Sequence, residues 1–62
     1  MKATPTDARG NPLHMGDSVE IDDGSCGRID KIEQTDDGEF WIHVKSGQYG
    51  WTRRSTQLYK WT

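Results

Sequence analysis

Residues 16–32 of this chain read Gly16-Asp17-Ser18-Val19-Glu20-Ile21-Asp22-Asp23-Gly24-Ser25-Cys26-Gly27-Arg28-Ile29-Asp30-Lys31-Ile32. Apolar and polar residues alternate over residues 18–21, a turn sequence follows over residues 22–25, and a second apolar run starts after it. Alternation with a period of two places successive side chains on opposite faces of a strand, and Asp-Gly favours a turn because glycine adopts positive φ without steric cost. The stretch therefore predicts a β-hairpin and an all-β fold.

The rest of the chain continues this pattern of short strands between turn sequences. Ile29 and Ile32 are three residues apart, so the second strand either contains a bulge or turns one of them outward. A short 3₁₀ turn is predicted before the last strand, over residues 55–58. Five short strands at regular spacing predict a small five-stranded barrel. The predicted strands are residues 18–21, 27–34, 39–44, 49–53 and 59–61.

The pairing of the third predicted strand with the fourth determines on which face of the sheet Trp51 lies. Its inward side chains are Phe40, Ile42 and Val44. Trp41 and His43 alternate with them and point outward. The fourth strand has two possible registers, and a slip of one residue moves Trp51 from one face to the other. We expect a turn of odd length around Gly47, which places Trp51 outward beside Trp41.

The length of the chain allows one domain. Its 62 residues are 31% hydrophobic, and a chain of this size buries only about 60% of the surface that it exposes when unfolded. Residues 1–12 contain Pro5, Gly10 and Pro12 with little apolar content, which predicts a loosely ordered leader. Residues 13–62 then form the barrel. Because burial is limited, a monomer and a weak homodimer both remain open.

Cysteine usage and hydropathy indicate a cytoplasmic protein. Cys26 is the single cysteine, so an internal disulfide is impossible. The N-terminal sequence is polar and no apolar run exceeds a few residues, which does not fit a signal peptide or a membrane span. We therefore expect a cytoplasmic location and no membrane partner.

Charge is distributed unevenly along the chain. Residues 1–44 contain all 10 acidic residues and four basic ones, for a net charge of −6. Residues 45–62 contain no acidic residue and four basic ones, for a net charge of +4. If the two segments occupy different surfaces, the folded protein has an acidic side and a basic side.

Two stretches resemble KOW-type and other SH3-like barrels. The first carries Gly16-Asp17, Val19, Ile21, Gly24, Gly27, Ile29 and Ile32, which is similar to the opening strands of these folds. The second carries Gly50-Trp51-Thr52, Ser55 and Leu58, which is similar to their late strand, 3₁₀ turn and last strand. The resemblance covers about residues 13–61. It implies a five-stranded, partly open barrel of two orthogonally packed sheets.

The chain departs from the subfamilies whose ligands are known. The loop after the first strand is basic in typical KOW modules, whereas here it is Asp22-Asp23. Leu13-His14-Met15 does not supply the Tyr-rich motif of peptide-binding SH3 domains. Gly50-Trp51-Thr52-Arg53 replaces the Val-Gln-Ile-Tyr run of the plasmid-borne dihydrofolate reductase barrel. The lead-in at residues 11–17 looks like small proteins of phages and bacterial mobile elements.

Catalytic and metal-binding patterns are missing from the sequence. No serine is accompanied by a histidine, and a barrel this small is filled by its own side chains. His14, His43 and Cys26 do not have the spacing of metal ligands. We therefore expect no enzyme activity, no cofactor and no metal, with a pore between subunits of an oligomer as the only route to catalysis.

The late segment of the chain interleaves aromatic rings with cations. Rings and cations in this pattern are typical of protein-binding hot spots, and they also suit base stacking and phosphate contact. The first hypothesis is a non-catalytic adaptor or inhibitor that binds another protein. The second is a nucleic-acid-binding module. The candidate binding residues are Trp41, Tyr49, Trp51, Arg53, Arg54 and Lys60.

Overall fold

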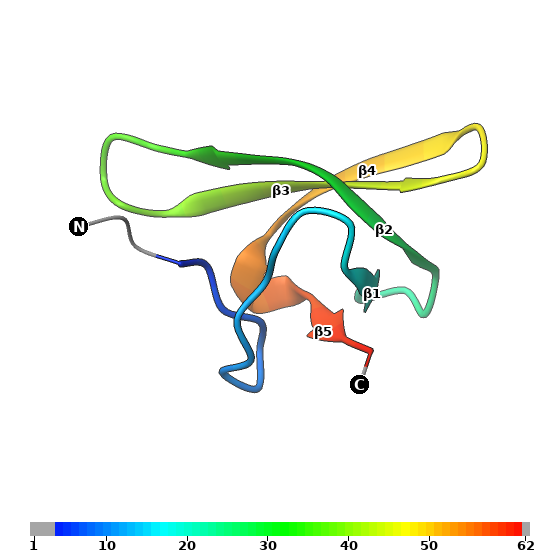
Figure 1. The fold of residues 1–62 in the computed structure, drawn as a ribbon, viewed down its shortest axis with the longest axis horizontal. Coiled ribbons are helices and arrows are strands. Elements are labelled where there is room, and N and C mark those ends of the chain that lie inside the picture. Colours follow the sequence, from blue (N-terminus) through cyan, green and yellow to red (C-terminus); the bar gives the residue numbers. More distant parts are fainter. Residues whose placement is uncertain (1–3, 62) are drawn as a thin grey trace.

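A computed structural model describes residues 4–61 of the chain. Residues 1–3 of the predicted leader and residue 62 of the predicted barrel lie outside the described residues. The described residues form one antiparallel sheet with the strand order β4-β3-β2-β1-β5 (Figure 1). A 3₁₀ turn, η1 (Ser55–Gln57), precedes the last strand, as predicted. The strands are β1 (Ser18–Glu20), β2 (Cys26–Gln34), β3 (Phe40–Ser46), β4 (Tyr49–Arg54) and β5 (Tyr59–Lys60).

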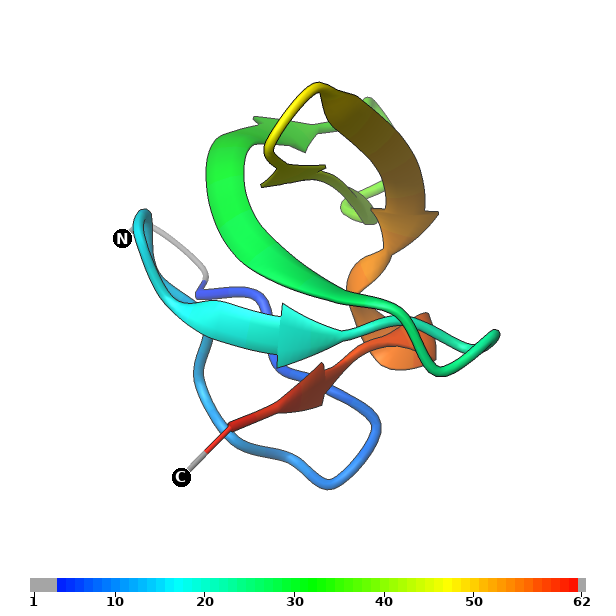
Figure 2. The same ribbon diagram turned by 90° about the vertical axis from the view of Figure 1, so that its right-hand side faces the viewer.

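The sheet is curled, with β3 and β4 on one side and β1 and β5 on the other (Figure 2). The long strand β2 passes between the two sides, because its first residues pair with β1 and the remainder pairs with β3. Gly27 pairs with Val19 of β1. A Cβ atom there would be 2.7 Å from both the Lys45 carbonyl oxygen and Val44 Cγ1, so the close approach of β2 to β3 requires glycine.

A bulge in β2 resolves the spacing of its two isoleucines. The pairing with β3 shifts between Ile29 and Lys31, which adds one residue to β2. Ile29 is therefore buried and Ile32 packs half-buried against the same core. The bulge was one of the two arrangements that the sequence allowed.

The core lies inside the curl and is built from both ends of the chain. The predicted inward positions of β1 and β3 are confirmed, with Phe40 half-buried at the margin. Leu58, just after the 3₁₀ turn, and Leu13, just before the first hairpin, close the core from below. The buried apolar residues are Leu13, Val19, Ile21, Ile29, Ile42, Val44 and Leu58.

The segment before Leu13, which the sequence analysis treated as a leader, contributes two buried residues, Pro5 and Asp7. Asp7 is only 3% exposed. Its carboxylate accepts hydrogen bonds from backbone N–H groups of Arg9, Asn11 and Lys60 at 2.8 to 2.9 Å. The described part of this segment is thus attached to β5.

The expected outward position of Trp51 is wrong. The β3–β4 turn has only two residues, Gly47 and Gln48, because Ser46 pairs directly with Tyr49. Gly47 has a φ of +62°, as a type II′ turn requires at this position. The even-length turn pairs Val44 with Trp51, so Trp51 lies on the inner face and packs half-buried against the core.

Candidate functional site

The predicted binding residues fall into three separate groups. The first group is a strip along the inner face of β4, formed by Tyr49, Trp51 and Arg53, which alternate along the strand. The rings of Tyr49 and Trp51 are stacked, with centroids 6.4 Å apart and an interplanar angle of 17°. Tyr49 is 64% exposed, whereas Trp51 and Arg53 are half-buried. We call these three residues the β4 strip.

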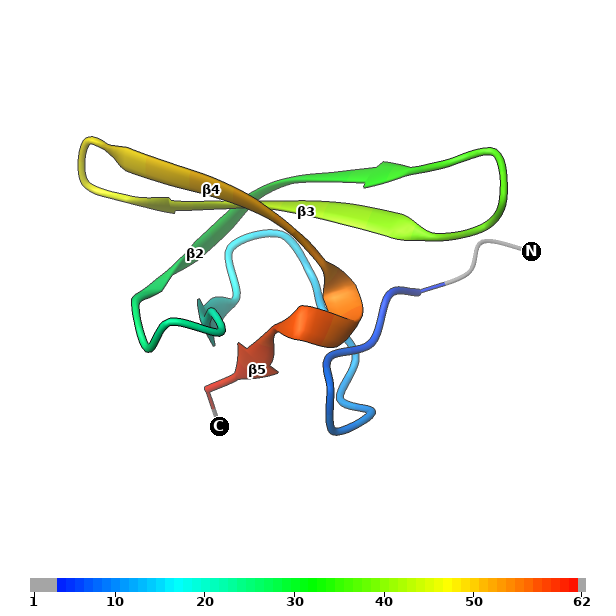
Figure 3. The same cartoon turned by 180° about the vertical axis from the view of Figure 1, so that it is seen from behind.

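The strip lies on a part of the chain that projects. The β3–β4 hairpin reaches beyond β1 and β5 at one end of the molecule (Figures 1 and 3). Tyr49, next to the turn of this hairpin, is open to solvent. A large ring held on a regular strand loses little conformational entropy on binding, which makes the strip suitable for recognition.

Arg53 connects the strip to the opposite side of the curled sheet. Its Nε lies 3.4 Å from Oδ1 of Asp22, in the β1–β2 turn, and its Nη1 donates to the Thr52 carbonyl oxygen at 2.9 Å. The guanidinium is therefore held in one orientation. The acidic Asp22, which the resemblance to KOW modules did not explain, serves as the ion-pair partner of Arg53.

The second group, Trp41 and Arg54, lies on the outer face. Trp41 is directly opposite Arg54 in the β3–β4 pairing, and the guanidinium carbon lies 4.7 Å from the centre of the indole ring. Glu39 forms an ion pair with the same guanidinium. Cation–π contact with a half-buried indole and an ion pair to a neighbouring carboxylate both stabilise this arrangement. Trp41 and Trp51 do not share a patch, because they are on opposite faces.

Lys60 forms the third group, away from the other candidates. Its Nζ donates to the Pro12 carbonyl oxygen at 3.0 Å and lies 3.3 Å from Oδ2 of Asp17. A hydrogen bond from the His14 backbone N–H, followed by the Lys60 ammonium, holds the pKa of Asp17 below its ordinary value. Lys60 thus ties β5 to the segment before β1, which is a structural role.

The ion pairs mix the two charged segments of the chain. Arg53, Arg54 and Lys60 each pair with a carboxylate from residues 1–44. Among the basic residues of 45–61 that the structure describes, Lys45 alone has no ion-pair partner. The folded chain therefore does not present the +4 segment as a separate basic surface.

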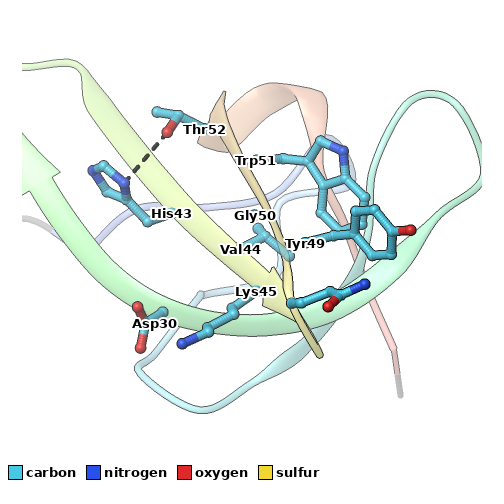
Figure 4. A pocket seen from close by; sticks show the side chains of 9 residues that line it. Asp30, His43, Val44, Lys45, Tyr49, Gly50, Trp51 and Thr52 are labelled. Atoms are coloured by element: carbon cyan, nitrogen blue, oxygen red, sulfur yellow. Dashed lines mark hydrogen bonds between the residues drawn. The ribbon is translucent and has the colours of Figure 1, made fainter.

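A hollow of about 360 Å³ lies above Gly50 on the outer face (Figure 4). Lys45 and Asp30 border it on one side, and His43 on the other, where its Nδ1 is 3.3 Å from Oγ1 of Thr52. The hollow exists because Gly50 has no side chain between those of its neighbours. Gly50 was not among the predicted binding residues, although a glycine inside a strand often marks the close approach of a ligand or another backbone.

Within residues 4–61, no three metal-ligating side chains cluster, and no helix is long and apolar enough to cross a membrane. Comparisons with protein-family models, with curated proteins and with solved structures find no match for this chain. The proposals below therefore depend on the geometry of the chain itself.

Proposed function

We propose that this chain is a non-catalytic module that binds another protein, as an adaptor or an inhibitor, through the β4 strip. The observation that carries the proposal is the exposed Tyr49 ring stacked on Trp51 and followed by the oriented guanidinium of Arg53. Tyrosine, tryptophan and arginine dominate the energetics of protein interfaces. In this strip all three side chains lie on one face of one strand.

We further propose that the curled sheet is an SH3-like barrel. The strand order, the antiparallel pairing of β1 with β5, and the 3₁₀ turn before the last strand all support this. A barrel of this size is filled by its own core, so recognition takes place on its outside. The projecting β3–β4 hairpin carries Tyr49, which has the largest exposed fraction among the aromatic side chains of residues 4–61.

The ion pairs favour a protein partner over nucleic acid. Binding to phosphate depends on unpaired lysine and arginine side chains, each releasing counterions from the nucleic acid. Arg53 and Arg54 are already placed against Asp22 and Glu39. A nucleic-acid ligand would have to displace these carboxylates or approach close to them, whereas a protein interface tolerates such pairs at its rim.

Two single-residue variants test the proposal. The tagged chain and its Tyr49→Ala variant are used to capture proteins from the source cells, with quantification of each captured protein. We expect at least one partner whose recovery falls about tenfold or more in the variant, the loss expected for an interface hot spot. Tyr49 is not part of the buried core, so the variant should still fold, with a loss of stability of about 0.5 to 1.5 kcal/mol from the stacking on Trp51.

Tyr59→Ala is the matched control, because Tyr59 is also exposed, lies on the other edge strand, β5, and is in contact with Arg9. Recovery of the partner with this variant should equal that of the parent chain. Equal recovery of every captured protein by the parent and both variants would contradict the proposal.

A further inference from the structure

The sheet has two edge strands, β4 and β5, and only one edge is covered. Along β5, the Ala8 N–H donates to the Leu58 carbonyl oxygen at 2.9 Å, and Asp7 accepts from the Lys60 N–H at 2.8 Å. Along β4, no backbone segment of residues 4–61 pairs with the side facing away from β3. An uncovered edge strand presents unpaired backbone groups to other chains.

The two-residue turn determines which groups point to this free edge. In such a hairpin, the residues that flank the turn, Ser46 and Tyr49, form a hydrogen-bonded pair, and the pairs then alternate. The N–H and C=O groups of Gly50 and Thr52 therefore point away from β3. The contact of Arg53 Nη1 with the Thr52 carbonyl oxygen agrees with this direction.

Gly50 is the one glycine of this chain that neither a positive φ nor a close neighbour requires. Five of the other glycines have positive φ, and Gly27 would bring a Cβ within 2.7 Å of the backbone of β3. A Cβ at Gly50 would approach only the Val44 carbonyl oxygen, at 3.9 Å. A glycine inside a strand often marks the close approach of another backbone. At Gly50 the free edge is therefore least screened by side chains.

We propose that a second copy of this chain adds to the free edge of β4, antiparallel, with Gly50 of one copy opposite Thr52 of the other. Each such pair exchanges both of its backbone hydrogen bonds. The two Trp51 side chains then face each other on the inner face, and each Tyr49 lies opposite Arg53 of the second copy. This register places no like charges opposite one another, and it joins two β4 strips into one continuous surface.

A second copy fits this edge better than an unrelated segment, because β4 is complementary to itself in this register. Rings meet rings or guanidinium groups on the inner face, and Gln48 lies opposite Arg54 on the outer face. A chain of 62 residues with limited burial also gains stability from association. One pair of edge strands makes a small contact, so the dimer is reversible.

Sedimentation velocity of the purified chain tests the proposal. Over a concentration range of about 1 µM to 1 mM, the parent chain should shift from monomer to dimer. Gly50→Pro removes the N–H that points to the free edge and leaves the β3–β4 hydrogen bonds in place, since proline is tolerated on that side of an edge strand. This variant should raise the dissociation constant at least tenfold.

Gly50→Ala is the matched control, because it keeps the N–H and its methyl group makes only an ordinary van der Waals contact, with the Val44 carbonyl oxygen at 3.9 Å. It should dimerise more strongly than Gly50→Pro, although its methyl group screens the edge slightly more than glycine does. A parent chain that stays monomeric at about 1 mM, the highest concentration of this range, would overturn the proposal. So would a Gly50→Pro variant that dimerises as strongly as Gly50→Ala.

Amide hydrogen exchange in the parent chain gives a second measurement that needs no variant. The Gly50 and Thr52 N–H groups should exchange more slowly as the concentration rises, and exchange rates that do not change would again overturn the proposal. These experiments contain no protein partner, so their failure leaves the proposed function intact. Loss of partner capture by Tyr49→Ala likewise does not depend on Gly50.

Discussion

Within residues 4–61, the two edge strands of the sheet differ in what covers them: β5 is covered by another segment of the chain, and β4 is open. The β5 edge is covered by residues from the other end of the chain, with a buried carboxylate bonded to a backbone N–H that is 53 positions away in sequence. The β4 edge carries exposed rings and free backbone groups on a projecting hairpin (Figure 1). The contrast shows that residues of the chain itself close one edge, whereas the other edge is available for the binding that we propose.

Asp7 is the residue on which the covered edge depends. Its two oxygens accept four hydrogen bonds, from the backbone N–H groups of Arg9, Asn11 and Lys60 and from the Asn11 side chain. Burial by itself would raise the pKa of Asp7, but these hydrogen bonds to the charged form lower it to about 2. The carboxylate is therefore ionised and fully used at neutral pH.

The largest expected effect comes from opening the covered edge with Asp7→Asn. The variant side chain keeps the size of the carboxylate but turns an NH₂ group toward N–H donors. We expect a loss of about 2 to 3 kcal/mol in the free energy of unfolding, because hydrogen bonds to a charged group are lost and buried donors are left unpaired. Urea unfolding followed by tryptophan fluorescence measures this loss.

Asp23→Asn provides the control for that measurement. Asp23 is exposed and accepts one hydrogen bond from the Ser25 N–H in the β1–β2 turn, which an amide oxygen also accepts. This variant should unfold close to the parent midpoint. If Asp7→Asn were as stable as Asp23→Asn, the covered edge would not depend on the carboxylate.

Acid should weaken the same edge in the parent chain. The pKa of Asp7 is lower in the folded chain than its ordinary value of 3.8, so its contribution to stability is present above that value. The contribution is lost as the pH falls through 3.8 towards about 2. We expect about 1 to 2 kcal/mol of destabilisation from this group, after allowance for screening by solvent.

Free energies of unfolding measured between about pH 5 and about pH 2 test this expectation, because paired carboxylates lose their contribution over about pH 5 to 1. Asp7→Asn should lose part of the pH dependence, because the titrating group is gone. An unchanged slope in the variant would show that other carboxylates cause the acid sensitivity.

The smallest expected effect concerns the open edge. Gly50→Ala should stabilise the monomer by about 0.5 to 1 kcal/mol, since the unfolded chain loses conformational freedom and the added methyl group meets no close neighbour. Urea unfolding of dilute samples, in which the chain is monomeric, measures the free energy of unfolding without a contribution from the dimer. A destabilised variant would mean that the space above Gly50 is needed by the folded monomer.

Much of the fold followed from local patterns. The alternation at Val19 and Ile21 and the turn at Asp23-Gly24 depend on neighbouring residues, so the strands were predicted within a few positions. The spacing of Ile29 and Ile32 left a bulge as one of two arrangements, and the structure has the bulge. The candidate site was predicted less well. Four of its residues lie on β4, where alternation distributes them over two faces, whereas Trp41 lies on β3 and Lys60 on β5.

Three features could not be read from the sequence, for related reasons. The register of β4 depended on whether the turn at Gly47 has an even or odd number of residues, which composition does not reveal. The burial of Asp7 depended on β5, and the neutralisation of Arg53 depended on Asp22 across the curl. The sequence shows a glycine at position 50, but only the structure shows that neither a positive φ nor a close neighbour requires it.

Strand periodicity and turn chemistry are properties of a few consecutive residues, so the linear chain already specified an all-β protein with a 3₁₀ turn before its last strand. Pairings between distant residues arise only when the sheet curls and brings both ends of the chain together. Folding in three dimensions therefore decided that Trp51 faces the core, that Asp7 covers β5, and that β4 remains open.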